Sequence, residues 1–164
     1  FLLRNAAENG GALAVAGSLT ELTAVATRIA HNSAKAKGGA LHVEDGKVIL
    51  ALNTLLENNV AVEGAAMHLS GGSTVFALPA PPGRWVNTAV ESEVPTVQPG
   101  LRTLVSTVAL GSHDEDYPFA CPPGTVGGTE IETQLSPVCV GACPAGSVCA
   151  SATHTPQRAP HIVA

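Results

Sequence analysis

Two histidines stand at matching places in a repeated pattern, and their imidazoles are candidates for metal binding. His42 lies in "ALHV" and His68 lies in "AMHL", 26 residues later. If these stretches are neighbouring strands, the two rings stack on one face, and an imidazole nitrogen is a common metal ligand. A metal site needs further ligands, however, and the sequence places no third one nearby. We therefore expect both histidines at exposed strand positions, with no metal or cofactor bound.

An acidic run, "HDED" at residues 113–116, offers clustered carboxylates that could hold Ca²⁺. The run lacks the alternating Asp or Asn and the glycine of a dedicated calcium loop. We therefore expect a solvated acidic turn.

Four cysteines are the remaining reactive groups, and all of them lie in "CPPGTVGG" and "SPVCVGACPAGSVC". An even count beside Pro-Gly turns predicts a disulfide framework. Zinc is the alternative, but it needs ligand pairs at short spacing, and no Cys-x-x-Cys occurs. Of the three possible pairings, locality favours Cys121–Cys139 and Cys143–Cys149. Pairing of Cys149 with a cysteine further downstream is the alternative.

The composition limits which fold can position these groups. The 164 residues are 45% hydrophobic but only 3% aromatic, so Ala, Val and Leu supply the apolar volume. Such side chains suit thin, stacked layers better than one large core. A net charge of -5 argues against a nucleic-acid partner, which requires a basic patch. No apolar run approaches the roughly 18 residues of a membrane span.

Proline and cysteine divide the chain. All 12 prolines lie from Pro79 onward, and all four cysteines lie within residues 121–149, so we expect a boundary near residue 78. The chain opens on Phe rather than Met, which suggests a fragment of a longer protein.

A repeat with a period of about 27 residues runs through residues 1–78. Asn5, Asn32 and Asn59 follow one another at a spacing of 27 residues. A glycine element recurs in step with them. A period of this size is typical of repeats that bury their apolar faces by stacking. The glycine element comprises Gly10, Gly11, Gly38, Gly39 and Gly64.

Strands fit these repeats better than helices. The stretch "AVATRIAHNSAKAK" could form a helix that ends at Gly38. Against this, each repeat holds short β-like runs separated by turns, such as "ALHV", "EDGK" and "VILAL". The repeats therefore predict a parallel β-helix of about three coils, stacked at roughly 4.8 Å.

Stacking assigns a role to each recurring residue. The three asparagines would form a hydrogen-bonded ladder at a turn, where Asn tolerates positive φ. The glycines permit the backbone of the corners. Leu13, Leu41 and Met67 would form an interior column.

The stretch "LPAPPGRWVNT" at residues 78–88 reads as the exit from the repeats. Its prolines would end the sheet and protect its edge. Asn87 falls one residue late for a fourth repeat. Trp85, the only Trp, is expected to pack over the open end rather than to serve as a ligand platform.

The apolar-x-x-Asn pattern with Gly-Gly-Ala-Leu resembles the repeat of polymorphic outer-membrane proteins. These are surface adhesins with a right-handed parallel β-helix, so the resemblance implies that handedness and an adhesive role. The phenylalanine characteristic of the family is replaced by Leu2, Ile29 and Leu56. The Cys-Pro-x-Gly pattern at residues 121–124 and 143–146 resembles a truncated ephrin-receptor-like module, which implies an extracellular location.

These observations predict three parts: parallel β-helix repeats at 1–78, a Pro-rich exit segment and linker at 79–120, and an irregular disulfide-containing module at 121–164. The expected function is a non-enzymatic structural or adhesive protein at the cell surface or outside the cell. Its partner would be an unknown protein or glycan, without nucleic acid and without a membrane span in these residues.

A carbohydrate-active enzyme similar to pectate lyases is one alternative, and a ligand-binding receptor ectodomain is the other. The enzyme requires acidic and basic groups that converge on one face. The candidates near the coils stand singly in turns: Glu44, Asp45, Lys47 and Glu63.

Overall fold

The computed structural model describes residues 1–77, 80–86, 90–93, 102–128 and 134–158, with the backbone alone for 90–93, 102–106 and 158. Every regular element in these ranges is a β-strand. The predicted all-β class is therefore confirmed. The helical alternative for "AVATRIAHNSAKAK" is excluded, because these residues hold strands separated by turns.

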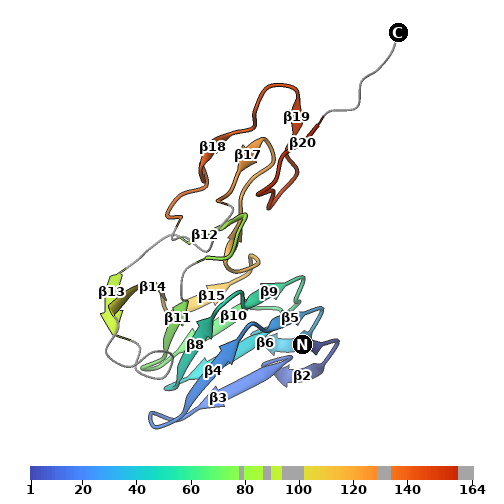
Figure 1. Cartoon of the computed structure of the whole chain (residues 1–164). Coiled ribbons are helices and arrows are strands. Elements are labelled where there is room, and N and C mark those ends of the chain that lie inside the picture. The colour runs from blue at the N-terminus through green and yellow to red at the C-terminus, as the bar shows by residue number, and fades with distance from the viewer. Residues whose placement is uncertain (78–79, 87–89, 94–101, 129–133, 159–164) are drawn as a thin grey trace.

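The first 77 residues form three repeats of one strand-and-corner pattern (Figure 1). Equivalent strands of successive repeats pair in parallel, in the orders β1-β5-β9, β3-β7-β10, β4-β8-β11 and β2-β6. The first repeat holds β1 (Leu2–Leu3), β2 (Ala6–Asn9), β3 (Leu13–Ala16) and β4 (Glu21–Val25). The second holds β5 (Arg28–Ala30), β6 (Ser33–Lys37), β7 (Leu41–Glu44) and β8 (Lys47–Ala51). The third holds β9 (Leu55–Glu57), β10 (Met67–Ser70) and β11 (Thr74–Ala77).

Within residues 79–120, which the sequence predicts to be an exit segment and linker, described strands return to the repeats. Strand β14 pairs antiparallel with β11, and β15 pairs antiparallel with β10. The sheets therefore continue beyond the third repeat, and the prediction that they end at the Pro-rich stretch is wrong. The strands of this part are β12 (Arg84–Trp85), β13 (Val90–Glu93), β14 (Arg102–Val108), β15 (Gly111–His113) and β16 (Phe119–Ala120).

The strands do not form the right-handed parallel β-helix of about three coils that the sequence predicted. In the part of the chain that the structure describes, they make seven separate sheets of two to five strands. Corner residues with positive φ, such as Gly10, Gly17 and Ala26, interrupt the extended backbone within a repeat. The two largest sheets are mixed, because β14 and β15 join them antiparallel. The period predicted which residues stack, but it did not predict how the sheets are organised.

Equivalent apolar side chains line up in columns that fill the space between the sheets. In the predicted column, Leu13 pairs with Leu41 and Leu41 pairs with Met67. Leu41 and Met67 are fully buried, whereas Leu13 in the outermost repeat is half-buried. Burial of such a side chain contributes roughly 1.5–3 kcal/mol. Further columns are Leu2–Ile29–Leu56, Val15–Val43–Leu69 and Leu22–Val48–Val75.

The asparagines form hydrogen bonds from repeat to repeat. The backbone N and the Nδ2 of Asn5 both donate to Asn32 Oδ1 at 2.9 Å. The backbone N and the Nδ2 of Asn32 donate to Asn59 Oδ1, at 3.0 and 2.9 Å. Each Nδ2 of the second and third asparagines also donates to a backbone carbonyl one repeat earlier, on Leu2 and Ile29 respectively. The amides thus stitch three successive corners together.

The left-handed backbone at this corner lies on a different residue from the one predicted. Positive φ falls on Arg4, His31 and Asn58, the residues immediately before the three asparagines. The turn made there directs the asparagine side chain between the repeats, so that Asn32 is only 1% exposed. The prediction of positive φ at the asparagines is therefore wrong.

The glycine corner has two parts with different physical reasons. The first glycine of each element has positive φ, as at Gly38, where φ is 67°. The second allows close approach between repeats, because a Cβ on Gly39 would lie 2.2 Å from the carbonyl oxygen of Ala65. Ala65 is the counterpart of Gly39 in the third repeat. It can carry a side chain because no fourth repeat stacks against it.

We expect Asn32→Ala to lower the free energy of unfolding by about 1–3 kcal/mol, because four side-chain hydrogen bonds at a buried site are lost. Asn5→Ala removes only the Asn5 Nδ2 bond to Asn32 at an exposed site and should cost less. Urea unfolding of both variants measures the difference. Equal losses would contradict the ladder. Asn87 lies outside the described residues, so Asn5 serves as the matched control.

Candidate functional site

The open side of the third repeat is covered by residues 111–120, which we call the capping segment. Its β15 pairs antiparallel with β10, so the last parallel strand acquires a neighbour. Leu56 and Tyr117 exchange backbone hydrogen bonds of 2.8 and 3.0 Å. Ala66 N donates to the carbonyl of His113 at 2.9 Å. These carbonyls stand where a fourth repeat would supply them.

Two carboxylates complete this backbone pairing. In the second repeat, His31 N and Gly39 N donate to carbonyls of the third repeat. Their counterparts in the third repeat donate to side chains instead, Asn58 N to Asp116 Oδ1 at 2.7 Å and Ala65 N to Asp114 Oδ1 at 3.0 Å. The acidic run is therefore more than the solvated turn that we expected, because two of its carboxylates cap strand ends.

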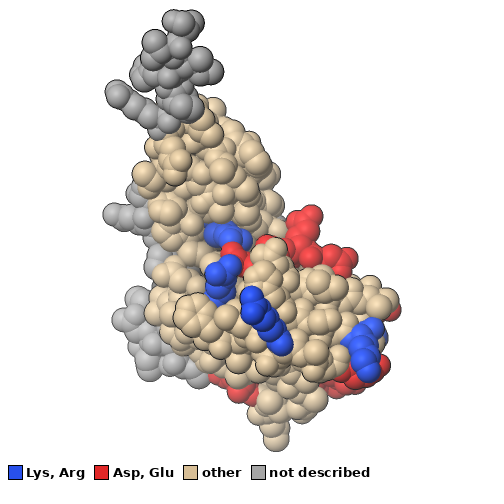
Figure 2. Space-filling view, turned by 90° about the vertical axis from the view of Figure 1, so that its right-hand side faces the viewer, with Lys and Arg blue, Asp and Glu red and all other residues tan. Residues whose placement is uncertain are grey.

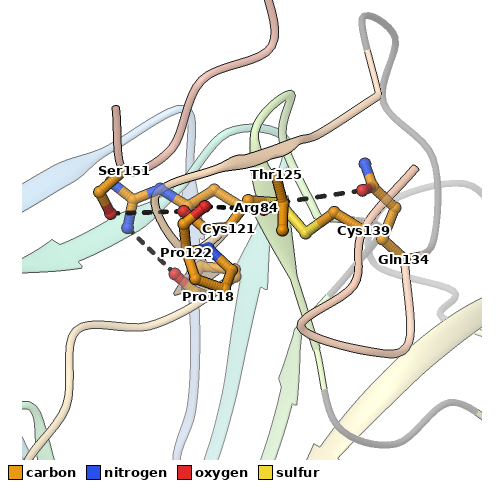
Figure 3. Close-up of a disulfide and its surroundings, with 8 residues drawn as sticks. All are labelled: Arg84, Pro118, Cys121, Pro122, Thr125, Gln134, Cys139 and Ser151. Atoms are coloured by element: carbon orange, nitrogen blue, oxygen red, sulfur yellow. Dashed lines mark hydrogen bonds between the residues drawn. A yellow bond between two sulfur atoms is a disulfide. The ribbon is translucent and has the colours of Figure 1, made fainter. Parts of the chain in front are cut away.

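A buried carboxylate ties the repeats to β12. Glu57 is 8% exposed and forms ion pairs with Arg28 of the second repeat and with Arg84 of β12. The distance to Arg28 Nε is 2.8 Å. Arg84 also donates to the carbonyl of Pro118 at 3.1 Å, as Figure 3 shows. One guanidinium therefore joins the third repeat to the capping segment.

The arm above the repeats in Figure 1 carries β17–β20 and two disulfides, Cys121–Cys139 and Cys143–Cys149. These are the pairs that locality favours. Each disulfide restricts the unfolded chain in a segment with few buried apolar residues. The arm strands are β17 (Thr125–Val126), β18 (Gly141–Ala142), β19 (Ser147–Val148) and β20 (Gln157–Arg158).

The first disulfide lies at the base of this arm (Figure 3). Cys121 is fully buried, and its backbone N donates to the carbonyl of Gly83 at 2.9 Å. Gly83 has positive φ, and a Cβ there would lie 2.1 Å from the carbonyl oxygen of Ala152. Two segments of the arm thus pack against the turn before β12, which fixes the arm beside that strand.

Three aromatic rings gather beside the acidic run. The ring centroids of Trp85 and Phe119 lie 4.7 Å apart, and Tyr117 meets Phe119 edge-on at 5.3 Å. A hollow of about 380 Å³ lies against Trp85, Phe119, Glu115 and Asp116. A second, of about 330 Å³, lies against Phe119, Tyr117, Glu115 and Asp114. Trp85 therefore lines a hollow beside the capped end of the repeats.

His42 and His68 stack across the β7–β10 pair, with ring centroids 5.5 Å apart. The prediction of exposed positions is wrong, because His68 is only 8% exposed and His42 is half-buried. His68 Nδ1 lies 3.0 Å from Ser112 Oγ and 3.9 Å from a carboxylate oxygen of Glu63. A catalytic triad uses opposite ring nitrogens for the acid and the nucleophile, whereas here both lie at Nδ1. The described residues also include no group of three or more His, Cys, Asp or Glu side chains placed to hold a metal ion.

Glu57, Arg84 and Phe119 each have a structural role here that the sequence does not predict. Glu57 occupies one of the two variable positions of the apolar-x-x-Asn pattern, so the repeat does not single it out. The arginine and the phenylalanine lie outside the repeat. A local signal existed only for Arg84, which stands directly before the single Trp.

Removing both capping carboxylates, Asp114→Ala with Asp116→Ala, should lower the free energy of unfolding by about 1–3 kcal/mol, since two backbone N–H groups lose their acceptors. Glu115→Ala is the matched control, because that side chain makes no hydrogen bond or ion pair with the described residues. Urea unfolding compares the variants. A loss equal to that of the control would contradict the capping role.

Stability should fall as the pH is lowered through the ordinary histidine range. Burial and the neighbouring His68 lower the pKa of His42 below 6.5, with Lys37 acting in the same sense and Glu44 opposing it. The unfolded state then binds this proton more readily, so the folded state loses stability as the pH falls through about 6.5. His42→Gln should flatten this slope in chemical unfolding at constant ionic strength. An unchanged slope would contradict the assignment to His42.

Comparisons with known proteins identify no relative of this chain. No protein-family model, no curated protein and no solved structure matches the chain. The resemblances to polymorphic outer-membrane proteins and to ephrin-receptor-like modules therefore rest on the quoted motifs alone.

Proposed function

We propose that this chain serves as a non-enzymatic structural or adhesive protein at the cell surface or outside the cell. The repeats provide a framework with fixed corners, and the disulfide-containing arm projects from its capped end. The observation that carries the proposal is the junction itself, where Glu57, Arg84 and Cys121 lock the arm to the repeats. A structural or adhesive protein that holds a binding surface in a fixed position needs its arm to be joined to its framework by contacts of this kind.

The location in this proposal is supported by the two disulfides. Disulfides persist in oxidising compartments and are rare where thiols are kept reduced. Among the residues that the structure describes, no helix is long and apolar enough to cross a membrane. The resemblance of the repeat to surface adhesins, and of the cysteine module to extracellular receptors, points in the same direction.

The adhesive role fits the site better than the enzymatic alternative does. The histidines and Ser112 lack the arrangement of an acid–base–nucleophile triad. Four of the charged groups near the site, Glu57, Arg84, Asp114 and Asp116, are engaged in structural contacts. A hydrolase or lyase would need such groups to converge on a substrate.

Labelling of intact cells that make the full-length protein tests the proposal. A membrane-impermeant, amine-reactive reagent should modify Lys35, whose side chain is 82% exposed, without permeabilisation. Mass spectrometry under non-reducing conditions should also recover a linked peptide that contains Cys121 and Cys139. Labelling only after permeabilisation, together with four free thiols, would overturn the surface location.

A further inference from the structure

We propose that the aromatic and acidic surface at the junction, formed by Trp85, Phe119, Glu115, Asp114 and Asp116, binds an arginine side chain presented by a partner polypeptide. The inference names a ligand for the adhesive role and rests on that role for its biological meaning. The binding itself can be tested on the purified chain alone.

The site is a pair of hollows with a shared wall. Glu115 and Phe119 line both, and Trp85 lies on one side while Tyr117 lies on the other. The volumes, about 380 and 330 Å³, lie at the lower end of the range for small-ligand pockets. Each hollow therefore has room for one long side chain and not for a large cofactor.

The charge of the walls selects a cation. Three carboxylates from residues 114–116 line the hollows, and no Lys or Arg stands among the described lining residues. In Figure 2, acidic side chains gather at the right-hand margin where the arm meets the repeats, and basic side chains lie to their left. A concave surface lined by one sign of charge concentrates ligands of the opposite sign.

The carboxylates are held in place and keep free acceptor capacity. Asp114 and Asp116 each accept a backbone N–H through Oδ1, which orients the group and leaves Oδ2 without a partner among the described residues. Glu115 is exposed and makes no ion pair with any described residue. An incoming cation therefore does not have to displace an existing salt bridge.

Arginine fits this combination of walls better than lysine does. Its planar guanidinium stacks on an aromatic face and can present a fork of donors to a carboxylate at its edge. The tilted pair of Trp85 and Phe119 provides the aromatic wall, and Glu115 and Asp116 line the same hollow. A compact ammonium would use the carboxylates but gain less from the rings.

Fluorescence of Trp85, the only Trp in the chain, reports directly on occupancy. The probes are a capped Gly-Arg-Gly tripeptide and its citrulline counterpart, which keeps the shape of arginine but lacks the charge. We expect a saturable change with the arginine peptide and binding weaker by at least about tenfold with citrulline. The lysine peptide should bind with intermediate strength.

Variants localise the effect. Glu115→Gln should weaken binding of the arginine peptide by about three- to tenfold, because one charged acceptor becomes neutral. Glu8→Gln changes an exposed carboxylate of the first repeat and is the matched control, with an unchanged affinity expected. Thermal unfolding of each variant should match that of the wild type, which separates binding from folding.

Three results would overturn the inference: no saturable response to the arginine peptide, equal affinity for citrulline, or an unchanged affinity in Glu115→Gln. A response to a neutral oligosaccharide without one to the arginine peptide would instead assign the surface to a glycan. A chain that binds arginine but is absent from the cell surface would overturn the proposed function alone.

Discussion

Backbone hydrogen bonding from one repeat to the next is the constraint on which the rest of the structure depends. Each repeat directs N–H groups toward carbonyls of the following repeat, as from Arg4 to Ala30 and from His31 to Glu57. The third repeat has no successor, so the N–H groups that it directs away from the second repeat would be left unpaired. An unpaired backbone group shielded from water costs about as much as a lost hydrogen bond. The chain therefore has to supply partners from outside the repeat.

The capping segment supplies them, and its position determines the rest of the junction. Backbone carbonyls of His113 and Tyr117 and two aspartate side chains replace a fourth repeat. Holding this segment in place brings Phe119 against Trp85 and Pro118 within reach of Arg84. The aromatic and acidic surface that we propose as a binding site is thus a consequence of closing the stack.

The sequence predicted the parts of the structure that repeat. A spacing of 27 residues was enough to align Asn5, Asn32 and Asn59 and to place glycine at the corners, because identical environments recur in each layer. It predicted the organisation of the sheets wrongly, since corner geometry and strands from beyond residue 100 decide it. The cap could not be predicted, because its partners lie about 50 residues apart and occur once.

Amide hydrogen exchange tests the central claim most directly. If the capping segment replaces a fourth repeat, the amides of Leu56, Ala65 and Ala66 should be protected about as well as those of Ile29, Gly39 and Ala40, their counterparts in the second repeat. Exchange in the third repeat that is faster by several orders of magnitude than in the second, under conditions where the protein is folded, would contradict the account.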